Sequence, residues 1–499
     1  MTADTATPTE TGNQSGRWDA LPLLVDGAEV TGRGAVLEVI DPATEEVVTE
    51  VRAADAAQVD EAVAAARRAF VSPAWAEIGG EGRRELIHRL ADLVEQHVDE
   101  LADAVTTEAG TPVSISAPLQ VMWPVQHLRW YADQAVVDRE EDLGPHQVPV
   151  PSHSVVGYRP VGVVAAIAAY NYPITLAVHK LGPALLTGCT VVLMPSPRTP
   201  VATLLLARLI REAGFPPGVV NVVVGGVEEA RRLTEHPDVA KVAFTGSVEV
   251  GRHVMCQAAS HLAGVVLELG GKSPAIMLPD ADVAAVAPAV HLRYCRNGGQ
   301  ACAAPTRLLV PRAQWDTFVD VTRSTIDEVV VGDPRDPATV VGPMITAAHR
   351  DRVERYVADA VASGASVVAG GGRPDLARGW FTNPAVVADV DNSWPIAQEE
   401  IFGPVSVAMP YDSVDEAVAI ANDSMFGLHA YVFSADLEAA RALAPRLRVG
   451  AVTINGGGGF RADAPMGGFG VSGIGREIGH WGIHEFLEPQ HVQWATPAG

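Results

Sequence analysis

The sequence predicts an α/β protein built from two units, each with a parallel β-sheet covered by helices. Between residues 161 and 260, short apolar runs alternate with longer segments whose apolar residues recur every three or four positions. This β-α-β-α order is typical of a parallel sheet with crossover helices. A second alternation of the same kind extends from residue 307 to residue 454. The two alternations together indicate two parallel-sheet units in one chain.

The N-terminal third combines short strands with helices. Short apolar pieces separated by turns predict strands and hairpins over residues 23–51. Helical spacing predicts helices over 55–70 and 82–108, and one or two more over 118–138 with an interruption at an internal proline. Residues 148–158 alternate enough to predict a separate strand.

The rest of the chain supplies the two alternations. In the first, the predicted strands are 161–167, 190–194, 219–224 and 241–245, and the predicted helices are 174–187, 201–213, 227–235 and 247–260. In the second, the predicted strands are 307–310, 366–369, 405–409, 430–433 and 451–454, and the predicted helices are 315–329, 346–363, 414–422 and 437–447. Glycine-rich runs predict loops over 456–459 and 465–475, and 484–494 is a candidate last strand.

Charge and cysteine content restrict the classes of partner. The formal net charge of −24 argues against nucleic acid or an anionic membrane surface. The four cysteines show no C-x-x-C spacing and the fifteen histidines no paired metal spacing, so we predict a reducing cytoplasm and no metal site. Residues 1–17 predict a disordered tail rather than a secretory signal. The apolar run 161–170 is too short to span a bilayer as a helix.

Cys302 is the candidate nucleophile. It follows the turn-prone residues 296–300 and lies between two alanines, which leaves room for a substrate to approach the sulfur. A thiolate is a strong nucleophile, but it needs a base or a positive local field to form near neutral pH. The alternative is a buried structural cysteine, a common fate of free cysteines.

A phosphate site is predicted where a strand ends and a helix begins, at Gly246 and Ser247. A helix N-terminus offers free N–H groups and a positive dipole end. Gly246 lets the backbone approach a ligand closely, and Ser247 can both cap the helix and bind that ligand. The alternative is an ordinary strand–helix turn, and the G-x-G-x-x-G pattern is absent here.

Three more strand ends or turns carry polar residues with a chemical use. Glu268 follows an apolar strand and precedes two glycines, so burial would raise its pKa and make it a usable general base. Asn171 follows another strand and can donate to a developing oxyanion. Glu400 can accept from ribose hydroxyls, and Phe402 can support a flat nicotinamide ring. Each has a plain alternative: a surface glutamate, a turn asparagine and a charged turn beside a core phenylalanine.

Together, in this order, these stretches resemble the aldehyde dehydrogenase superfamily over nearly the whole chain. Any one motif alone is weak, but their joint occurrence is highly specific. The matching motifs are Tyr170-Asn171-Tyr172-Pro173, Phe244-Thr245-Gly246-Ser247 with Gly251, Glu268 to Pro274, Gly299-Gln300-Ala301-Cys302, Glu399 to Pro404, and Pro465-Met466-Gly467-Gly468 with Ser472 to Glu477.

The resemblance implies two Rossmann-like parallel-sheet domains and a small β flap through which the chain forms a homodimer or homotetramer. The implied domains are a dinucleotide-binding domain (18–139 and 159–270), a catalytic domain (271–480) and an oligomerisation domain (140–158 and 481–499).

The resemblance also implies the reaction. Cys302 would attack an aldehyde, Asn171 and the Cys302 N–H would hold the oxyanion, hydride would pass to NAD(P), and Glu268 would activate water to release the acid from a thioester. The implied cofactor contacts are Tyr170, Met194, Gly246, Ser247, Gly251, Leu269, Glu400 and Phe402.

Departures from the family pattern concern the adenosine end of the cofactor. Where the family usually has Lys-Pro-Ser-Glu, this chain has Met194-Pro195-Ser196-Pro197, so two ribose contacts are missing. NAD is the expected cofactor with weakened adenosine binding, and NADP is not excluded because the lost glutamate no longer repels a 2′-phosphate. Arg198, Arg231 and Arg232 are candidate substitutes for the missing contacts.

The expected substrate is an uncharged aliphatic or aromatic aldehyde. The implied pocket residues are apolar or small: Tyr172, Ala301, Ala303, Phe460 and Met466. If Arg461 points inward, a carboxylated semialdehyde becomes the better choice. Two alternatives to the hydrolytic enzyme stay open: a CoA-acylating enzyme, against which Glu268 argues, and a non-catalytic relative, which Met194 and Pro197 keep open.

Overall fold

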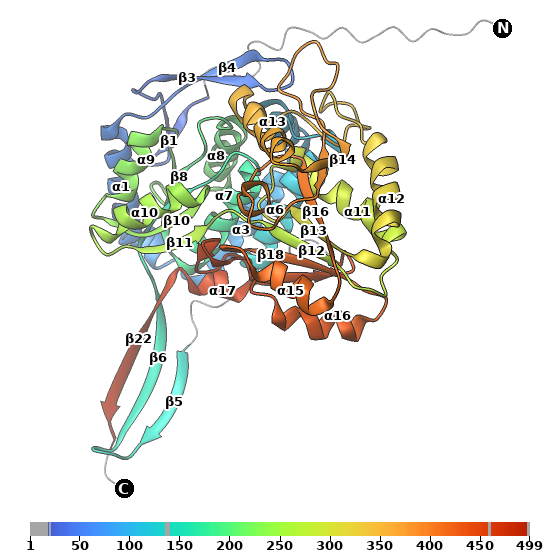
Figure 1. The fold of residues 1–499 in the computed structure, drawn as a ribbon. Helices are drawn as coiled ribbons and strands as arrows, with labels where there is room; N and C mark the ends of the chain where they lie inside the picture. Colours follow the sequence, from blue (N-terminus) through green and yellow to red (C-terminus); the bar gives the residue numbers. More distant parts are fainter. Residues whose placement is uncertain (1–17, 19–20, 135–139, 458–460, 497–499) are drawn as a thin grey trace, which may run out of the picture.

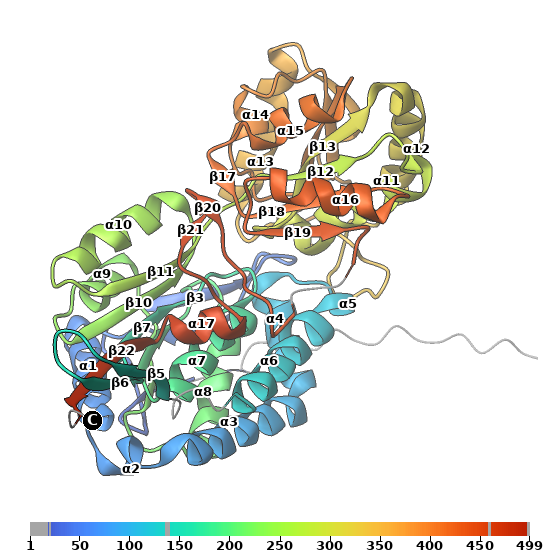
Figure 2. The ribbon, with the colours of Figure 1, turned by 90° about the horizontal axis from the view of Figure 1, so that it is seen from below.

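The computed structural model describes residues 18, 21–134, 140–457 and 461–496, and the predicted disordered tail lies outside them. Two parallel sheets, each covered by helices, form the body, and a small antiparallel sheet projects from it (Figure 1). Seen from below, the two sheets form separate bodies, with the C-terminal part of the chain passing between them (Figure 2). The α/β class with parallel-sheet domains is therefore confirmed. The exact domain boundaries stay a prediction.

The first sheet has eight strands and carries the first alternation. Its order is β2 (Ala28–Val30), β1 (Leu23–Val25), β9 (Val220–Val222), β8 (Thr190–Met194), β7 (Val163–Ile167), β10 (Val239–Thr245), β11 (Gly264–Glu268) and β21 (Gly473–Ile474). The strands from β9 to β11 pair in parallel. Its helices are α1 (Ala56–Phe70), α3 (Gly79–Gln96), α4 (Val98–Ala109), α6 (Trp123–Ala132), α7 (Pro173–Thr187), α8 (Val201–Ala213), α9 (Val227–Thr234) and α10 (Val248–Ala259).

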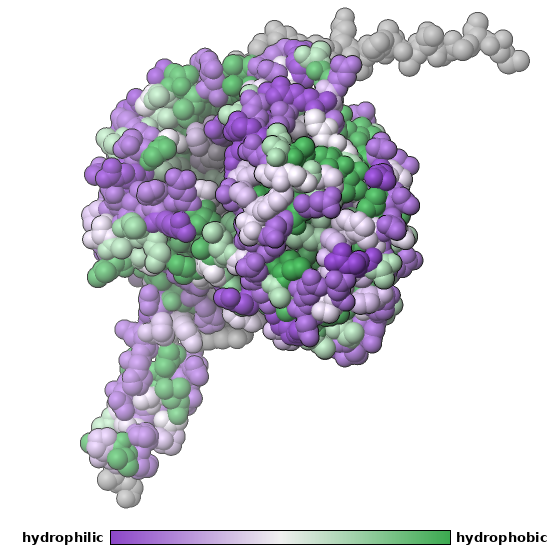
Figure 3. All heavy atoms as spheres, in the orientation of Figure 1, coloured by the Kyte–Doolittle hydropathy of each residue, from purple (hydrophilic) through white to green (hydrophobic). Residues whose placement is uncertain are grey.

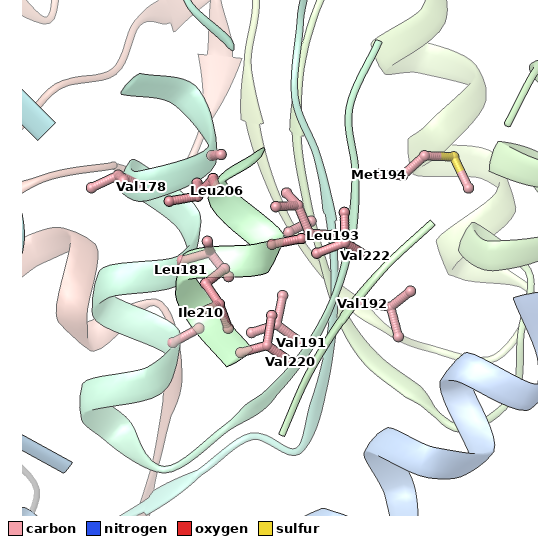
Figure 4. Close-up of a cluster of buried hydrophobic side chains, with 14 of the residues drawn as sticks. Val178, Leu181, Val191, Val192, Leu193, Met194, Leu206, Ile210, Val220 and Val222 are labelled. Atoms are coloured by element: carbon pink, nitrogen blue, oxygen red, sulfur yellow. The ribbon is translucent and has the colours of Figure 1, made fainter. Parts of the chain in front are cut away.

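Alternation along β8 shows how this sheet is buried on both faces. Val191 and Leu193 point toward α7 and α8, while Val192 and Met194 point to the opposite face (Figure 4). All five residues of β8 are buried. A strand buried on both faces reads as a continuous apolar run, which is why the sequence predicted this one without error.

The order of strands in this sheet reverses between β7 and β10. From β7 the chain proceeds to β8 and β9 on one side, and then returns to β10 and β11 on the other. In open parallel sheets, ligands bind outside the carboxyl ends of the two strands that flank such a reversal. Here those ends carry the segments that begin at Ala168 and Gly246.

The second sheet has seven strands. Its order is β14 (Ser366–Gly370), β15 (Ala385–Ala388), β16 (Val405–Tyr411), β13 (Pro305–Pro311), β12 (Ser273–Met277), β18 (His429–Phe433) and β19 (Ala451–Ile454). Its helices are α11 (Val283–Cys295), α12 (Trp315–Asp327), α13 (Ala347–Ala362), α14 (Pro395–Gln398), α15 (Val414–Asn422) and α16 (Leu437–Leu443). Two clusters of buried apolar side chains pack against it.

The projecting sheet joins segments far apart in sequence. β22 (Leu487–Ala495) pairs antiparallel with β6 (Ser152–Pro160), which pairs with β5 (Glu140–His146). Apolar side chains stay exposed on and beside it, including Val150, Val492 and Trp494, and hydrophobic surface is visible near its tip (Figure 3). The strand predicted over 148–158 is β6, which begins and ends later than expected. β5 was not predicted because Glu140–His146 has no apolar alternation.

Several elements differ from the predictions. The helix predicted over 82–108 is two helices, α3 and α4, separated at His97. The segment 118–138 contains a π-helix (Ser116–Met122) before α6, and its proline lies in the first turn of α6, where no N–H is needed. β12 was not predicted, and the strand accommodates its proline, Pro274, at a register shift.

The remaining elements are short or connect the larger ones. They are β3 (Val36–Asp41), β4 (Glu46–Arg52), α2 (Pro73–Ala76), α5 (Val113–Ile115), β17 (Phe426–Gly427), β20 (Phe469–Gly470), α17 (Gly479–His484) and 3-10 turns at Arg296–Gly299, Arg312–Gln314 and Ala444–Arg446. β20 and β21 lie in the stretch predicted to be loop. No helix among the described residues is long and apolar enough to cross a membrane.

Candidate active site

A cavity of about 630 Å³ opens at the carboxyl ends of β7 and β10 in the first sheet and at the start of β13 in the second sheet. Asn171, Glu268 and Cys302 all line it. Asn171 follows β7, Glu268 ends β11, and Cys302 precedes β13. The cavity therefore forms at the strand reversal of the first sheet and brings together three residues that lie 97 and 34 positions apart in the sequence.

A tight turn delivers Cys302 to the cavity. Asn297, Gly298 and Gly299 all have left-handed backbone, with φ of 55°, 63° and 70°. A Cβ on Gly299 would lie 2.2 Å from the Gly403 carbonyl carbon, so only glycine fits. Asn297 is stabilised there because Thr111 Oγ1 donates to its Oδ1 at 2.9 Å, while its Nδ2 donates to the Asn171 carbonyl at 3.1 Å.

Asn171 is rigidly anchored beside this turn. Its Nδ2 donates to the Gln300 carbonyl at 2.9 Å, and Gln120 donates to its backbone carbonyl at 2.9 Å. The Gln300 amide in turn accepts from the Ile345 N–H at 3.0 Å and from Tyr170 at 3.3 Å. One N–H of the Asn171 amide is used by Gln300, which leaves the other for a ligand oxygen.

The Cys302 thiol is held in its neutral form. Burial, followed by the carboxylates of Glu400 and Glu268, raises the pKa of Cys302 to about 12. The thiolate therefore requires a nearby base or an added positive charge before it can act as a nucleophile.

Glu268 is a buried carboxyl without a hydrogen-bond partner. The residue is 3% exposed, and neither carboxyl oxygen has a partner among the described residues. Burial, with the neighbouring Glu477 carboxylate, raises the pKa of Glu268 well above its usual value. A carboxyl of this kind is suited to general acid–base chemistry near neutral pH.

A buried ion pair beside Glu268 was not predicted from the sequence. Lys180 Nζ donates to Glu477 Oε1 at 2.7 Å and to Thr245 Oγ1 at 2.6 Å, and both charged residues are buried. The signal in the sequence was a lysine within the apolar helix α7, where all fifteen residues are buried. Its partner lies 297 positions away, so only the fold could identify it.

The N-terminus of α10 faces the other part of the cavity. Ser247 caps the helix by accepting from the Val250 N–H at 3.3 Å, as predicted. Gly246, Ser247 and Val250 line the cavity, so the positive end of the helix dipole points into it. Gly251 lies under the helix, where a Cβ would be 2.6 Å from Leu269.

Glu400 and Phe402 lie opposite this helix. Glu400 Oε1 accepts from the Gly271 N–H at 3.0 Å, and burial raises the pKa of Glu400 to about 7. Phe402 has a φ of 60°, an unusual value for an aromatic residue. The hydrogen bond between His349 Nε2 and the Phe402 carbonyl oxygen, at 2.7 Å, stabilises this backbone conformation. The Phe402 ring packs edge-on against Tyr170 at 6.0 Å between centroids.

The remaining predicted site residues divide into three groups. Tyr172, Leu269, Ala301, Ala303 and Met466 line the cavity, whereas Met194 and Gly251 do not. Phe460 lies outside the described residues. Of the arginines considered as substitutes, Arg198 lines the cavity, while Arg231 pairs with Glu235 and Arg232 with Asp60 on the surface.

Fold and cavity define an α/β protein of the dinucleotide-binding class, with a thiol beside a buried carboxyl. The family model described as "Aldehyde dehydrogenase family" matches residues 30–492, and the chain belongs to that family. It is 44% identical to a geranial dehydrogenase from Castellaniella defragrans, over 88% of this chain and 91% of that one. It is 38% identical to human mitochondrial aldehyde dehydrogenase, over 92% and 88%.

Solved structures agree with the fold. A mutant of aldehyde dehydrogenase C from Pseudomonas syringae, complexed with NAD⁺ and octanal, has a TM-score of 0.89 at 40% identity, with 94% of this chain and 96% of that chain covered. An NAD⁺ complex of aldehyde dehydrogenase from Bacillus cereus has a TM-score of 0.92 at 37% identity, with 95% and 96% covered. The resemblance stated from the sequence is thus confirmed.

Proposed function

We propose that this protein oxidises an aldehyde to the carboxylic acid with NAD as the hydride acceptor. The observation that carries the proposal is the meeting of Cys302, Asn171 and Glu268 in one cavity, beside a helix N-terminus. A thiol, an oxyanion donor and a buried base are the groups that acyl chemistry on sulfur requires.

The residues present fit a dinucleotide. The N-terminus of α10 at Gly246 and Ser247 suits a pyrophosphate. Glu400 has one oxygen on the Gly271 N–H, which leaves the other for a ribose hydroxyl. A Cβ on Gly270 would lie 2.3 Å from Glu400 Oε2, so this glycine keeps the space for the carboxylate. When bound, NAD supplies a hydride acceptor and a positive charge.

The first half-reaction belongs to Cys302 and Asn171. The Cys302 thiol releases its proton to solvent, its sulfur adds to the aldehyde carbon, and the resulting oxyanion accepts from the free N–H of Asn171 and from the Cys302 backbone N–H. Loss of hydride from that carbon leaves a thioester on Cys302. Because Asn171 is fixed by Gln300 and Gln120, its donor is already oriented when charge develops.

The second half-reaction belongs to Glu268. Its carboxylate takes a proton from water, the water attacks the thioester, and the Cys302 thiol is released with the acid. Glu477 and Lys180 lie behind Glu268. The Glu477 carboxylate favours the protonated form of Glu268 and the Lys180 ammonium favours its ionised form, so the pair sets the pH at which Glu268 acts as a base. This base for water is the reason for preferring hydrolysis to transfer onto CoA.

Titration of the purified protein with NAD and with NADP tests the proposal, followed by turnover with a small aldehyde panel. We expect NAD to bind and to be reduced. Arg198, on the cavity wall near Ser196 and Pro197, is the residue we expect to decide how well NADP competes, so Arg198→Ala should weaken NADP more than NAD. If neither dinucleotide binds, the departures at Met194 and Pro197 have disabled the site and the non-catalytic alternative takes its place.

We propose that the protein is a homo-oligomer assembled through the projecting sheet of β5, β6 and β22. Trp494 and Val492 stay about half exposed on it, at 47% and 45%, and such side chains favour a protein partner. The double variant Val492→Asp and Trp494→Asp should lower the mass measured by light scattering to that of a monomer or a smaller assembly. An unchanged mass would place the interface elsewhere.

A reducing cytoplasm is the compartment we propose. Cys189, Cys256, Cys295 and Cys302 are all free thiols, and the proposed reaction requires Cys302 to stay reduced. Alkylation by iodoacetamide in gently lysed cells would test this, because oxidised Cys302 would resist labelling.

A further inference from the structure

Two arginines stand in the part of the cavity that the proposed aldehyde would occupy. The lining beyond Cys302 is mostly aromatic and apolar, and it consists of Leu119, Trp123, Tyr172, Leu176, Tyr431 and Met466. Arg293 and Arg296 line the same part of the cavity. The sequence predicted an apolar pocket here and singled out neither arginine.

Both arginines are fixed relative to the nucleophile by their position in the chain. Arg293 lies in the last turn of α11, and Arg296 begins the turn that leads to Cys302. The Arg293 guanidinium carbon lies 4.7 Å from the centroid of the Tyr431 ring. Tyr431 in turn donates its hydroxyl to the Ala303 carbonyl at 2.8 Å, one residue beyond Cys302. A short chain of contacts therefore connects this cation to the nucleophile.

The positive charges of both arginines reach the interior of the cavity. Burial raises the pKa of Tyr172 to about 12, and the charges of Arg296 and Arg293 oppose that rise. Both arginines have the same effect on Tyr431. Since Tyr172 and Tyr431 also feel the ionised form of Cys302, the two guanidinium groups, the two phenols and the thiol share one region.

In the described part of the chain, neither arginine forms an ion pair with a carboxylate. Arg461, the residue that the sequence singled out as a possible cation, behaves in the opposite way. Its side chain is 73% exposed, pairs with Asp463 at 2.6 Å and does not line the cavity. His179 also lines the cavity, and it is kept neutral because burial, then His127 and Lys180, lower its pKa.

Arg293 is half-buried and Arg296 is exposed, so the two guanidinium groups stand at the rim of an otherwise apolar pocket, where no described carboxylate pairs with them. A guanidinium group matches a carboxylate in shape and donates two parallel N–H bonds to it. A neutral aldehyde would offer these two cations no anion, whereas an aldehyde with a carboxylate at its far end would supply one.

We propose that the pocket selects aldehydes that carry a carboxylate at the end remote from the carbonyl, with Arg296 and Arg293 as the specificity-determining residues. This inference rests on the proposed function, because it assigns the substrate class of the same site. The aldehyde carbon lies at Cys302, the apolar middle of the molecule contacts Tyr172 and Trp123, and the carboxylate binds at the arginines.

Two substrates of matched shape test the proposal: 4-formylbenzoate and methyl 4-formylbenzoate. They share the ring and the aldehyde and differ in the charge at the far end. We expect the wild-type kcat/KM to be about tenfold or more higher for the anion, and Arg296→Met to remove most of that preference. Arg296→Lys should retain part of this preference, because lysine keeps the positive charge but lacks the two parallel N–H donors of the guanidinium group.

Arg461→Met is the matched control, since it removes an arginine that is near in sequence to the pocket residues but exposed and already paired. It should leave the ratio of the two kcat/KM values unchanged. Arg293→Met should lower the ratio too, and the double variant should lower it furthest. Equal rates for anion and ester in the wild type, unaltered in Arg296→Met, would overturn the proposal while leaving aldehyde oxidation intact.

Binding without turnover separates this inference from the proposed function. Terephthalate, the product expected from 4-formylbenzoate, is titrated by calorimetry into the wild type and Arg296→Met. Binding that weakens about tenfold or more in the variant supports the anion site even if no aldehyde is oxidised. Absence of binding to the wild type contradicts the anion site, whatever the enzyme does with neutral aldehydes.

Discussion

Replacing Cys302 by alanine is expected to abolish aldehyde oxidation, with a fall in kcat of about 10⁴-fold or more. The loss should be this large because no other described thiol lines the cavity: Cys189 and Cys295 are buried and Cys256 is exposed on α10. NAD should still bind with nearly unchanged affinity, since the proposed cofactor contacts lie on α10 and around Glu400. The measurements are the steady-state rate of NADH formation and a fluorescence titration with NAD.

Cys256→Ala is the control for that experiment. It removes a thiol of the same chemistry from the exposed face of α10, and it should leave kcat within about twofold of the wild type. Retained turnover in Cys302→Ala would remove Cys302 from the mechanism and leave the cavity as a binding site.

The second large effect is expected for Glu268→Gln. Loss of a general base costs about 10²- to 10⁴-fold, and here the cost should fall on hydrolysis of the thioester rather than on its formation. The variant should therefore release a rapid burst of about one NADH per active site, followed by slow turnover. Stopped-flow absorbance at the NADH band measures both phases.

The pH dependence gives a further readout on Glu268. The carboxyl acts as a base only when ionised, and burial with the Glu477 charge raises its pKa well above the usual value. Steady-state turnover of the wild type should therefore rise as pH increases through that raised pKa, and Glu268→Gln should lose this rise. The exposed Glu438→Gln serves as a control and should keep it.

An unchanged burst and steady state in Glu268→Gln would contradict the role of Glu268. A third outcome distinguishes the two chemistries of release. If CoA accelerates turnover of the wild type and appears in the product as a thioester, the release step is acyl transfer to CoA, and the hydrolytic proposal is wrong.

The sequence determined the architecture of the first sheet and much of the candidate site. β8 and α8 appear with the predicted bounds, because strands buried on both faces and helices with a regular apolar stripe carry their structure in local pattern. The predicted residues Asn171, Glu268 and Cys302 come together because each lies at or close to a strand end that faces the cavity. Their order and spacing also identified the family.

Only the tertiary structure decided the electrostatics of the site. Lys180 and Glu477 are 297 positions apart, and nothing in the local sequence of either one marks the other as its partner. The sequence singled out neither Arg293 nor Arg296 as a site residue, whereas it offered Arg461 as the candidate cation of the pocket.

The fold reverses those expectations about the arginines, because the direction in which a side chain points depends on the helix or turn that carries it. α11 and the turn after it present Arg293 and Arg296 to the cavity, while Arg461 is paired with Asp463 on the surface. Local pattern therefore sets which elements form and which residues stand at their ends. Which charges face one another across the cavity is set by how those elements pack, and that packing depends on contacts between residues far apart in the chain.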